Sequence, residues 1–246
     1  MGRSAAIVLL EVPEGVTVQV DLAPPVSPAH GRCGFQAVPP GFHRVEARGR
    51  DLRAKDWVLV TGGETQVRTC DASGLLLPTS RYRAAQVAGL RAEGELRLGD
   101  YPVEPNALWP ALTAPLAPES FPPQLRSDPP GKGSHFLRAL EGTHGGEWPS
   151  FLQELAWSFL AGHLDQDPAG RTRWRELVEA TCGAGGLSAT RNLDLFQRVG
   201  TLLPAQLATL AAEEREPLQA AARRLGTDLQ ATGEAGLQAA AKALLA

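Results

Sequence analysis

The stretch Gly34–His43 constrains the fold more than any other part of the sequence, because it places two adjacent prolines and a glycine between two strand-like runs. Pro39 has no N–H group and a fixed φ, so it cannot take part in the hydrogen bonding of a central strand. Pro40 and Gly41 suit the two central positions of a type II turn, where glycine supplies a positive φ. We therefore expect one strand to end before this turn and another to begin near His43.

Strand-like segments follow one another in the first part of the chain, separated by turn residues and not by helices. The run Ala5–Val12 is continuously apolar, which is typical of a strand buried on both faces, whereas Val16–Val20 alternates apolar and polar residues. We predict that these two segments pair as a hairpin and that a second hairpin turns at Thr61–Glu64. Further strands are expected at Phe42–Arg48, Trp57–Thr61 and Thr65–Cys70. Strands joined by short turns predict an N-terminal antiparallel β-sandwich or barrel-like domain.

Helical periodicity dominates the chain after Trp148. Apolar residues recur every four positions within Phe151–Leu160, and Pro149 precedes them at a position where helices commonly start. We expect Pro204 and Pro217 to lie near the starts of helices as well. Further helices are predicted at Ser80–Arg91, Arg171–Cys182, Ser188–Leu203 and Glu234–Ala246.

The chain thus divides into three predicted parts with an α+β fold. Residues 1–100 form a β-rich domain, and residues 148–246 form an all-α helical domain. Residues 101–147 are rich in proline and glycine, which is typical of an extended connector, and they include a short helix near Asn106–Leu112.

Composition argues against several classes of protein. The formal net charge is −3, which is unfavourable for a nucleic-acid surface spread over the whole chain. No apolar run reaches the length of a membrane span, and the first residues lack the cleavage site of a signal peptide. Cys33, Cys70 and Cys182 are widely spaced and form no CxxC motif, which favours a reducing compartment. We expect a cytoplasmic protein without direct contact to nucleic acid or membrane.

Two segments resemble ligand-binding loops only in part. Asp165–Glu176 has the length of a calcium-binding EF-hand loop, but Ala169 stands at ligand position five and Thr172 replaces the apolar residue at position eight. A capped loop between two helices is the better interpretation. Gly131–Ser134 lacks the first glycine and the preceding strand of a phosphate-binding loop, so we interpret it as a linker. We expect no metal ion and no cofactor.

His43 is the strongest candidate for acid–base chemistry, since a turn fixes it at the start of a strand. The interpretation that we favour is structural: the imidazole braces the turn through hydrogen bonds. The alternative is an enzyme that uses His43 as a general base in a pocket of the β-rich domain, which requires an acidic or thiol partner beside the ring. The sequence has no GxSxG motif that would supply a nucleophilic serine.

A set of short, ordered motifs resembles the Aar-two family of splicing factors. Gly34–His43 is similar to the family's IPPG-H signature, and Leu98–Pro102 is similar to its LGxYP motif. Other pieces follow in the family's order at Gly89–Arg91, Trp109–Thr113, Glu154–Gly162, Trp174–Leu177 and Leu202–Leu207. Together these pieces cover nearly the whole chain, and strands followed by helices are the layout of the family.

The resemblance implies a non-enzymatic binding protein. Members of the family are assembly factors that hold the large central protein of a spliceosomal ribonucleoprotein before its maturation, and they use no cofactor and no catalytic residues. By this resemblance we expect a protein partner, a monomer or weak oligomer, and candidate partner contacts at Phe42 and Trp109. The residues of the structural signature are Gly34, Phe35, Pro39, Pro40, Gly41 and His43.

Overall fold

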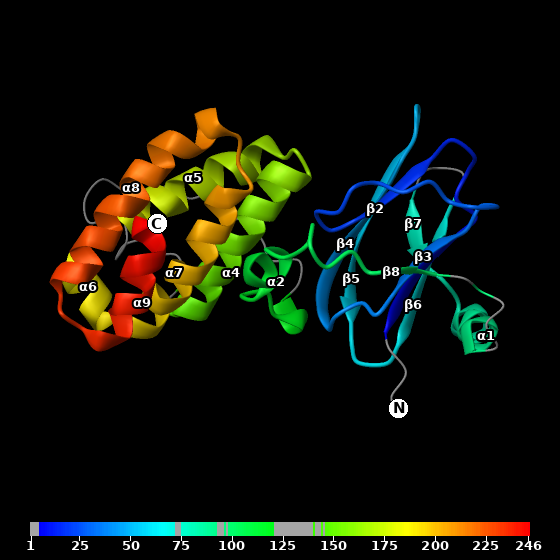
Figure 1. Ribbon diagram of the computed structural model, residues 1–246, viewed down its shortest axis with the longest axis horizontal. Helices are drawn as coiled ribbons and strands as arrows, with labels where there is room; N and C mark the ends of the chain where they lie inside the picture. Colours follow the sequence, from blue (N-terminus) through cyan, green and yellow to red (C-terminus); the bar gives the residue numbers. More distant parts are fainter. Residues whose placement is uncertain are drawn as a thin grey trace. The chain divides into compact units, whose positions relative to one another are not determined.

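The computed structural model describes residues 5–71, 75–92, 96, 98–120, 140, 144 and 146–246. Two compact units divide the chain, Met1–Pro110 and Ala111–Ala246. The described residues contain eight strands, all in the first unit, and the long helices after Trp148 lie in the second (Figure 1). The fold is therefore mixed, with strands first and helices later, as the sequence predicts.

The first sheet has five strands in the order β7-β6-β1-β3-β8. Its strands are β1 (Ala6–Leu10), β3 (Cys33–Gln36), β6 (Thr65–Cys70), β7 (Leu76–Pro78) and β8 (Gly99–Asp100). β1 is antiparallel to β3 but parallel to β6, and β3 is parallel to β8. The prediction of a purely antiparallel domain is therefore wrong, because the chain returns to this sheet through long crossovers as well as through short turns.

β1 lies at the centre of the first sheet and is buried on both faces. Ile7 and Leu9 belong to the core that the two sheets share. Val8 and Leu10 pack with Val87 of helix α1 (Arg81–Ala92). The continuous apolar run of β1 is thus explained by a sheet on one side and a helix on the other.

The second sheet is antiparallel and has three strands in the order β2-β4-β5. Its strands are β2 (Thr17–Val20), β4 (Gly41–Arg48) and β5 (Arg53–Val60). Val18, Val45 and Val58 join the shared core, so the two open sheets form a sandwich and not a closed barrel. Neither predicted hairpin forms: β1 and β2 lie in different sheets, as do β5 and β6, because the turns after Leu10 and Val60 carry the chain across the sandwich.

The turn at Pro39–Gly41 joins the two sheets, since β3 belongs to the first sheet and β4 to the second. Gly41 has a positive φ of 136°, but it is the first residue of β4 and pairs with Val60, so it does not take the predicted place at the centre of a type II turn. Gly34 packs closely against β1: a Cβ atom here would lie 2.9 Å from the carbonyl oxygen of Ile7. The signature stretch therefore links the two sheets through one turn, and its Gly34 allows the close approach of β3 to β1 within the first sheet.

The helices of the second unit follow one another through short connections. They are α4 (Trp148–Phe159), the π-helical turn η3 (Leu160–Leu164), α5 (Pro168–Cys182), α6 (Gly185–Arg191), α7 (Leu193–Ala208), α8 (Ala212–Ala231) and α9 (Ala235–Leu245). Shorter elements precede them at α2 (Trp109–Thr113) and at the 3-10 helix η1 (Pro118–Ser120). α4 begins at Trp148 with a proline in its first turn, as the sequence predicts.

Two prolines depart from their predicted places. Pro204 lies inside α7 and Pro217 inside α8. On both sides of Pro204 the helix buries Val199, Leu203 and Leu207, so packing of this face overrides the local signal for a helix start.

The predicted connector is divided between the units. Residues 101–110 belong to the first unit, where Tyr101, Asn106 and Trp109 are buried. Residues 121–139, which include four of the nine prolines of the predicted connector, lie outside the described residues. Among the described helices, none combines the length and the apolar character that a membrane span requires.

Candidate functional site

The imidazole of His43 is enclosed in the first unit, with 2% of the residue exposed. Its Nδ1 atom lies 2.7 Å from Oδ2 of Asp21, and its Nε2 atom lies 2.9 Å from the carbonyl oxygen of Pro39. Both ring nitrogens are therefore engaged within the chain, one by a carboxylate and the other by a backbone carbonyl oxygen. The turn and the end of β2 are thereby tied to β4.

Asp21 is the centre of this group, which we call the Asp21 cluster (Asp21, Pro39, His43, Arg44 and Tyr101). Its Oδ1 atom accepts the backbone N–H of Arg44 at 2.7 Å, and its Oδ2 atom accepts the hydroxyl of Tyr101 at 2.6 Å as well as the His43 ring. Burial and the neighbouring Asp21 carboxylate raise the pKa of Tyr101 far above its ordinary value, so the phenol remains a donor. Asp21 itself is 1% exposed and receives three hydrogen bonds.

The Asp21 cluster has the composition of an acid–base site but not its accessibility. A general base must offer a free lone pair within reach of a substrate proton. Here Nε2 of His43 faces the Pro39 carbonyl, and the opposite nitrogen faces Asp21. The geometry therefore supports the structural interpretation of His43, in which the imidazole braces the turn.

Phe42 and Trp109, the candidate partner contacts, lie in the interior of the first unit. The indole N–H of Trp109 donates to the carbonyl oxygen of Phe42 at 2.7 Å, and its ring stacks on Trp57 with 5.7 Å between centroids. Both residues are buried. Neither side chain is therefore on the surface, where a partner would contact it.

A second closed cluster surrounds Glu46 on β4. Its carboxylate accepts hydrogen bonds from Arg48 at 2.8 Å and Arg53 at 2.7 Å, and it forms a 2.9 Å ion pair with Arg44. Burial alone would raise the pKa of Glu46, but the guanidinium groups of Arg48, Arg44 and Arg53 outweigh it and hold the pKa at about 2. This carboxylate is ionised and fully occupied.

The three thiols are poor nucleophiles. Burial raises the pKa of Cys33 to about 11 and that of Cys182 to about 12, and it also raises the pKa of Cys70. Since the thiolate is the reactive form, all three remain protonated and inert near neutral pH. They are free cysteines, as their spacing predicts.

The loop that resembles an EF-hand is used for helix capping. Oδ1 of Asp167 accepts the backbone N–H of Ala169 at 3.1 Å, which caps the start of α5. Glu176, at the position of the last calcium ligand, accepts a hydrogen bond from Arg173 at 3.3 Å. Within the described residues, no three acidic, histidine or cysteine side chains are arranged to hold a metal ion. Gly131–Ser134, the segment resembling a phosphate-binding loop, lies outside the described residues.

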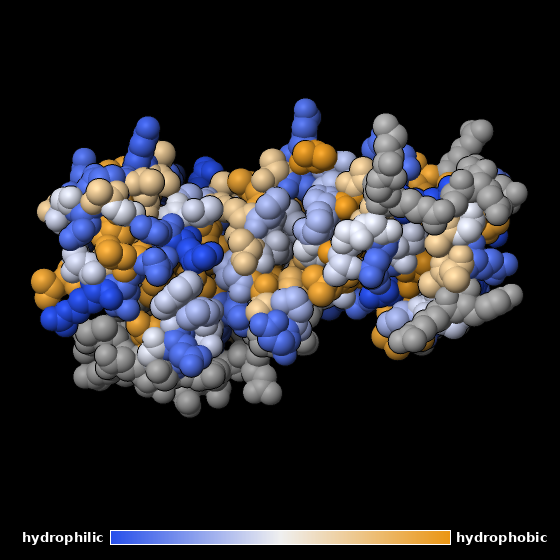
Figure 2. Space-filling view, turned by 90° about the horizontal axis from the view of Figure 1, so that it is seen from below, coloured by the Kyte–Doolittle hydropathy of each residue, from blue (hydrophilic) through white to orange (hydrophobic). Residues whose placement is uncertain are grey.

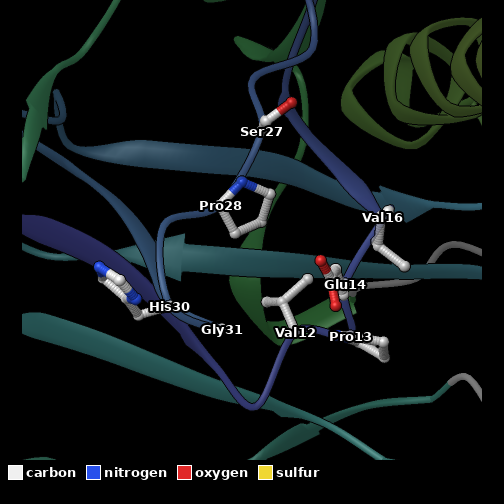
Figure 3. Close-up of a pocket in the computed structure, with 9 residues that line it drawn as sticks. Val12, Pro13, Glu14, Val16, Ser27, Pro28, His30 and Gly31 are labelled. Carbon is white, nitrogen blue, oxygen red and sulfur yellow. The ribbon is translucent and has the colours of Figure 1, made fainter.

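Two surface pockets of the first unit meet at His30 and Gly31. The loop pocket has a volume of about 450 Å³ and lies between the turn after β1 and the segment before β3 (Figure 3). It is lined by Val12, Pro13, Glu14, Gly15, Val16, Ser27, Pro28, His30 and Gly31. In Figure 3, His30 and Val16 mark its two ends, and Pro28 lies between them. Its lining combines two prolines with a carboxylate and a hydroxyl group.

The second surface pocket of the first unit, which we call the helix pocket, has a volume of about 390 Å³. It is lined by Leu10, Glu11, His30, Gly31, Arg32, Arg83, Gln86, Val87, Leu90 and Leu96. Its leucine and valine side chains form an apolar floor, and charged groups stand at its rim. This combination is typical of a binding site, in which apolar contact supplies affinity and a few polar groups supply orientation.

No protein-family model matches the chain, and no curated protein matches it.

A third pocket, of about 480 Å³, lies in the second unit. One of its walls is the α7 face formed by Asp194, Gln197, Arg198 and Thr201, and Trp148 lies beneath the guanidinium of Arg198 at 5.4 Å. The cation–π contact occupies both side chains with each other. On the face of the molecule shown in Figure 2, hydrophobic residues appear in small groups separated by hydrophilic ones.

Sequence reasoning identified His43 but missed its partners. Asp21 gave no signal beyond ending an alternating strand, and its φ of 53° could not be read from the sequence. Tyr101 stood in a motif, Leu98–Pro102, without an assigned role. The helix pocket was missed entirely, because its residues come from three separate segments whose meeting depends on the fold.

Proposed function

We propose that this chain is a non-enzymatic, Aar-two-like binding protein that holds a partner protein, as an assembly factor does. The observation that carries the proposal is the closed state of the Asp21 cluster. His43, the candidate acid–base group, is buried, and both of its ring nitrogens are engaged, by Asp21 and by the Pro39 carbonyl oxygen. An imidazole engaged in this way stabilises the fold. We therefore assign the function of the chain to binding through its surface.

The meeting of three motifs supports the resemblance. His43 of the signature and Tyr101 of the LGxYP-like motif are far apart in the sequence, but both hydrogen bond to Oδ2 of Asp21. Trp109 of the third motif donates to the carbonyl oxygen of Phe42, within the signature stretch. Motifs that converge on one interior are expected of a family whose shared residues maintain a scaffold for binding.

The surface of the first unit supplies a candidate binding site. The helix pocket offers an apolar floor beside exposed charged groups, and it shares His30 and Gly31 with the adjacent loop pocket. By the resemblance, the partner is a large protein awaiting assembly into a ribonucleoprotein, held without direct contact to nucleic acid. We propose that this takes place in the cytoplasm, where three free cysteines remain reduced.

The alternative function is an enzyme with its site near His43. It would require Nε2 of His43 to leave the Pro39 carbonyl and a substrate to enter beside Asp21. His43 lines none of the three pockets described above. The binding role therefore agrees better with the geometry.

Affinity purification of the full-length tagged chain from its native host tests the proposal. We expect one protein to be recovered repeatedly above background, in amounts that approach those of the bait. The same purification is made with two variants. Arg32→Glu changes the helix pocket, and Arg223→Glu, at an exposed position of α8, is the matched control. Repeated recovery of nothing above background would overturn the proposed function.

A further inference from the structure

The helix pocket lies where the pairing of β1 with β3 ends, beside residues with a positive φ. The ladder between these strands ends at the pair Leu9 and Cys33. Immediately beyond it, Glu11, His30 and Gly31 have φ values of 58°, 51° and 71°. The two segments stay joined beyond the ladder, since the backbone N–H of Val12 donates to the carbonyl oxygen of Gly31 at 3.0 Å. Together with α1 they line the helix pocket.

The floor of the helix pocket is apolar and already partly covered. Leu10 and Val87 are buried, and Leu90 and Leu96 are half-buried at its sides. An aliphatic side chain placed here would complete the packing of the small cluster formed by Val8, Leu10, Val67 and Val87. The pocket volume of about 390 Å³ admits one such side chain with its adjoining backbone.

The rim of the helix pocket carries an excess of positive charge. Arg83 donates to Glu11 at 2.6 Å, and both side chains are substantially exposed, so this ion pair is weak and exchangeable. Arg32 is exposed and forms no ion pair within the part of the chain that the structure describes. A carboxylate entering the pocket would meet the guanidinium of Arg32 directly and would compete with Glu11 for that of Arg83.

We propose that the helix pocket binds an extended segment of a partner protein in which an aliphatic residue stands next to an acidic one. This inference rests on the proposed function and names the chemistry of the partner. The aliphatic side chain lies on the floor formed by Leu10, Val87 and Leu90, and the carboxylate pairs with Arg32.

The two pockets adjoin at His30 and Gly31, and this adjacency favours a peptide over a small amphipathic acid. A short fatty acid would fit entirely within the helix pocket and would make no use of the loop pocket. Beyond His30 and Gly31 the loop pocket adds about 450 Å³, with the hydroxyl of Ser27 and the carboxylate of Glu14 as hydrogen-bonding groups for a peptide backbone (Figure 3). The rings of Pro13 and Pro28 give apolar contact there. An extended chain uses both pockets.

Titration of the full-length protein with short peptides, followed by amide chemical shifts, tests the inference. The probes are acetylated and amidated tetrapeptides with the central pair Leu-Glu or Leu-Lys, and hexanoate as a free acid. We expect the Leu-Glu peptide to shift the amides of Arg32, Gln86 and Leu90 at millimolar concentration. Arg32→Gln should weaken this binding by about tenfold. Glu11→Gln should strengthen it, because it releases Arg83, and Arg223→Gln should leave it unchanged.

The outcomes separate this inference from the proposed function. Equal binding of the Leu-Lys peptide, or tighter binding of hexanoate than of the Leu-Glu peptide, overturns the acidic peptide as the ligand. The absence of shifts at the helix pocket overturns the site. If affinity purification still recovers a partner that Arg32→Glu retains, the inference is wrong and the binding function stands. If no partner is recovered but the peptide binds, the proposed function fails, while the preference of the helix pocket for an aliphatic residue next to an acidic one stands.

Discussion

The Asp21 cluster and the helix pocket both gather charged and polar side chains in the first unit, and they differ in how these groups are satisfied. In the cluster, Asp21 receives hydrogen bonds from His43, Tyr101 and the backbone of Arg44, and it is almost fully buried. In the pocket, one exposed ion pair joins Arg83 to Glu11. The difference distinguishes groups that hold the fold from groups that can exchange their partner.

Physical chemistry explains why the two regions respond differently to mutation. A buried polar group that loses its partner retains the full cost of desolvation, whereas an exposed group turns to water. The same substitution of charge by amide should therefore be severe in the Asp21 cluster and mild at the rim of the pocket. Four measurements sharpen this comparison, from the largest expected effect to the smallest.

Asp21→Asn should produce the largest loss. The amide keeps the size of the side chain and tolerates a positive φ, but it removes the charge that three donors share. We expect the free energy of unfolding to fall by about 3 kcal/mol, measured by urea denaturation of the full chain. A loss below about 1 kcal/mol would show that the cluster does not hold the fold.

Glu46→Gln should cost about 2 kcal/mol, since it weakens the hydrogen bonds from Arg48 and Arg53. Its pH dependence is a second readout. Because the pKa of Glu46 is lowered from 4.5 to about 2 in the folded state, its stabilising effect is complete above about 4.5 and is lost as the pH falls towards 2. The stability difference between wild type and variant should therefore shrink over that interval, and a constant difference would contradict the account.

Arg32→Gln and Glu11→Gln should each change the free energy of unfolding by less than about 0.5 kcal/mol. Both residues are exposed, and water replaces the groups that are removed. The same denaturation experiment checks this expectation. A loss comparable to that of Asp21→Asn would place the rim of the pocket among the groups that hold the fold.

The smallest effect is expected for the thiols. Their raised pKa values leave little thiolate, so a maleimide reagent at neutral pH should label Cys33, Cys70 and Cys182 very slowly in the folded chain. Labelling in urea provides the control, where all three should react. Rapid labelling of the folded chain, read by mass spectrometry, would show that one thiol is open to solvent and ionised.

Local features of the sequence predicted individual elements well. The strand expected at Thr65–Cys70 is β6, and the one expected at Phe42–Arg48 differs from β4 by one residue. Alternation of apolar and polar residues reports the burial of each strand, which is a local property. Likewise, Pro149 correctly indicated the start of α4.

The pairing of strands and the composition of the sites could not be predicted in the same way. β1 pairs with β3 and β6, and nothing in its own sequence distinguishes these partners from β2. Asp21 meets Tyr101 across eighty positions in sequence, and Arg83 meets Glu11 across seventy-two. Such contacts depend on the packing of the two sheets and α1. The family resemblance could therefore locate the motifs in the sequence but could not give the contacts that their residues make.

The central claim is that the first unit binds a partner protein at the helix pocket while the Asp21 cluster only supports the fold. Hydrogen–deuterium exchange of the full chain, with and without the partner recovered by affinity purification, tests it most directly. The account predicts that the partner slows exchange in residues 28–32 and in α1, and leaves the wall of the third pocket, residues 194–202, unchanged. Protection confined to residues 194–202 would contradict it.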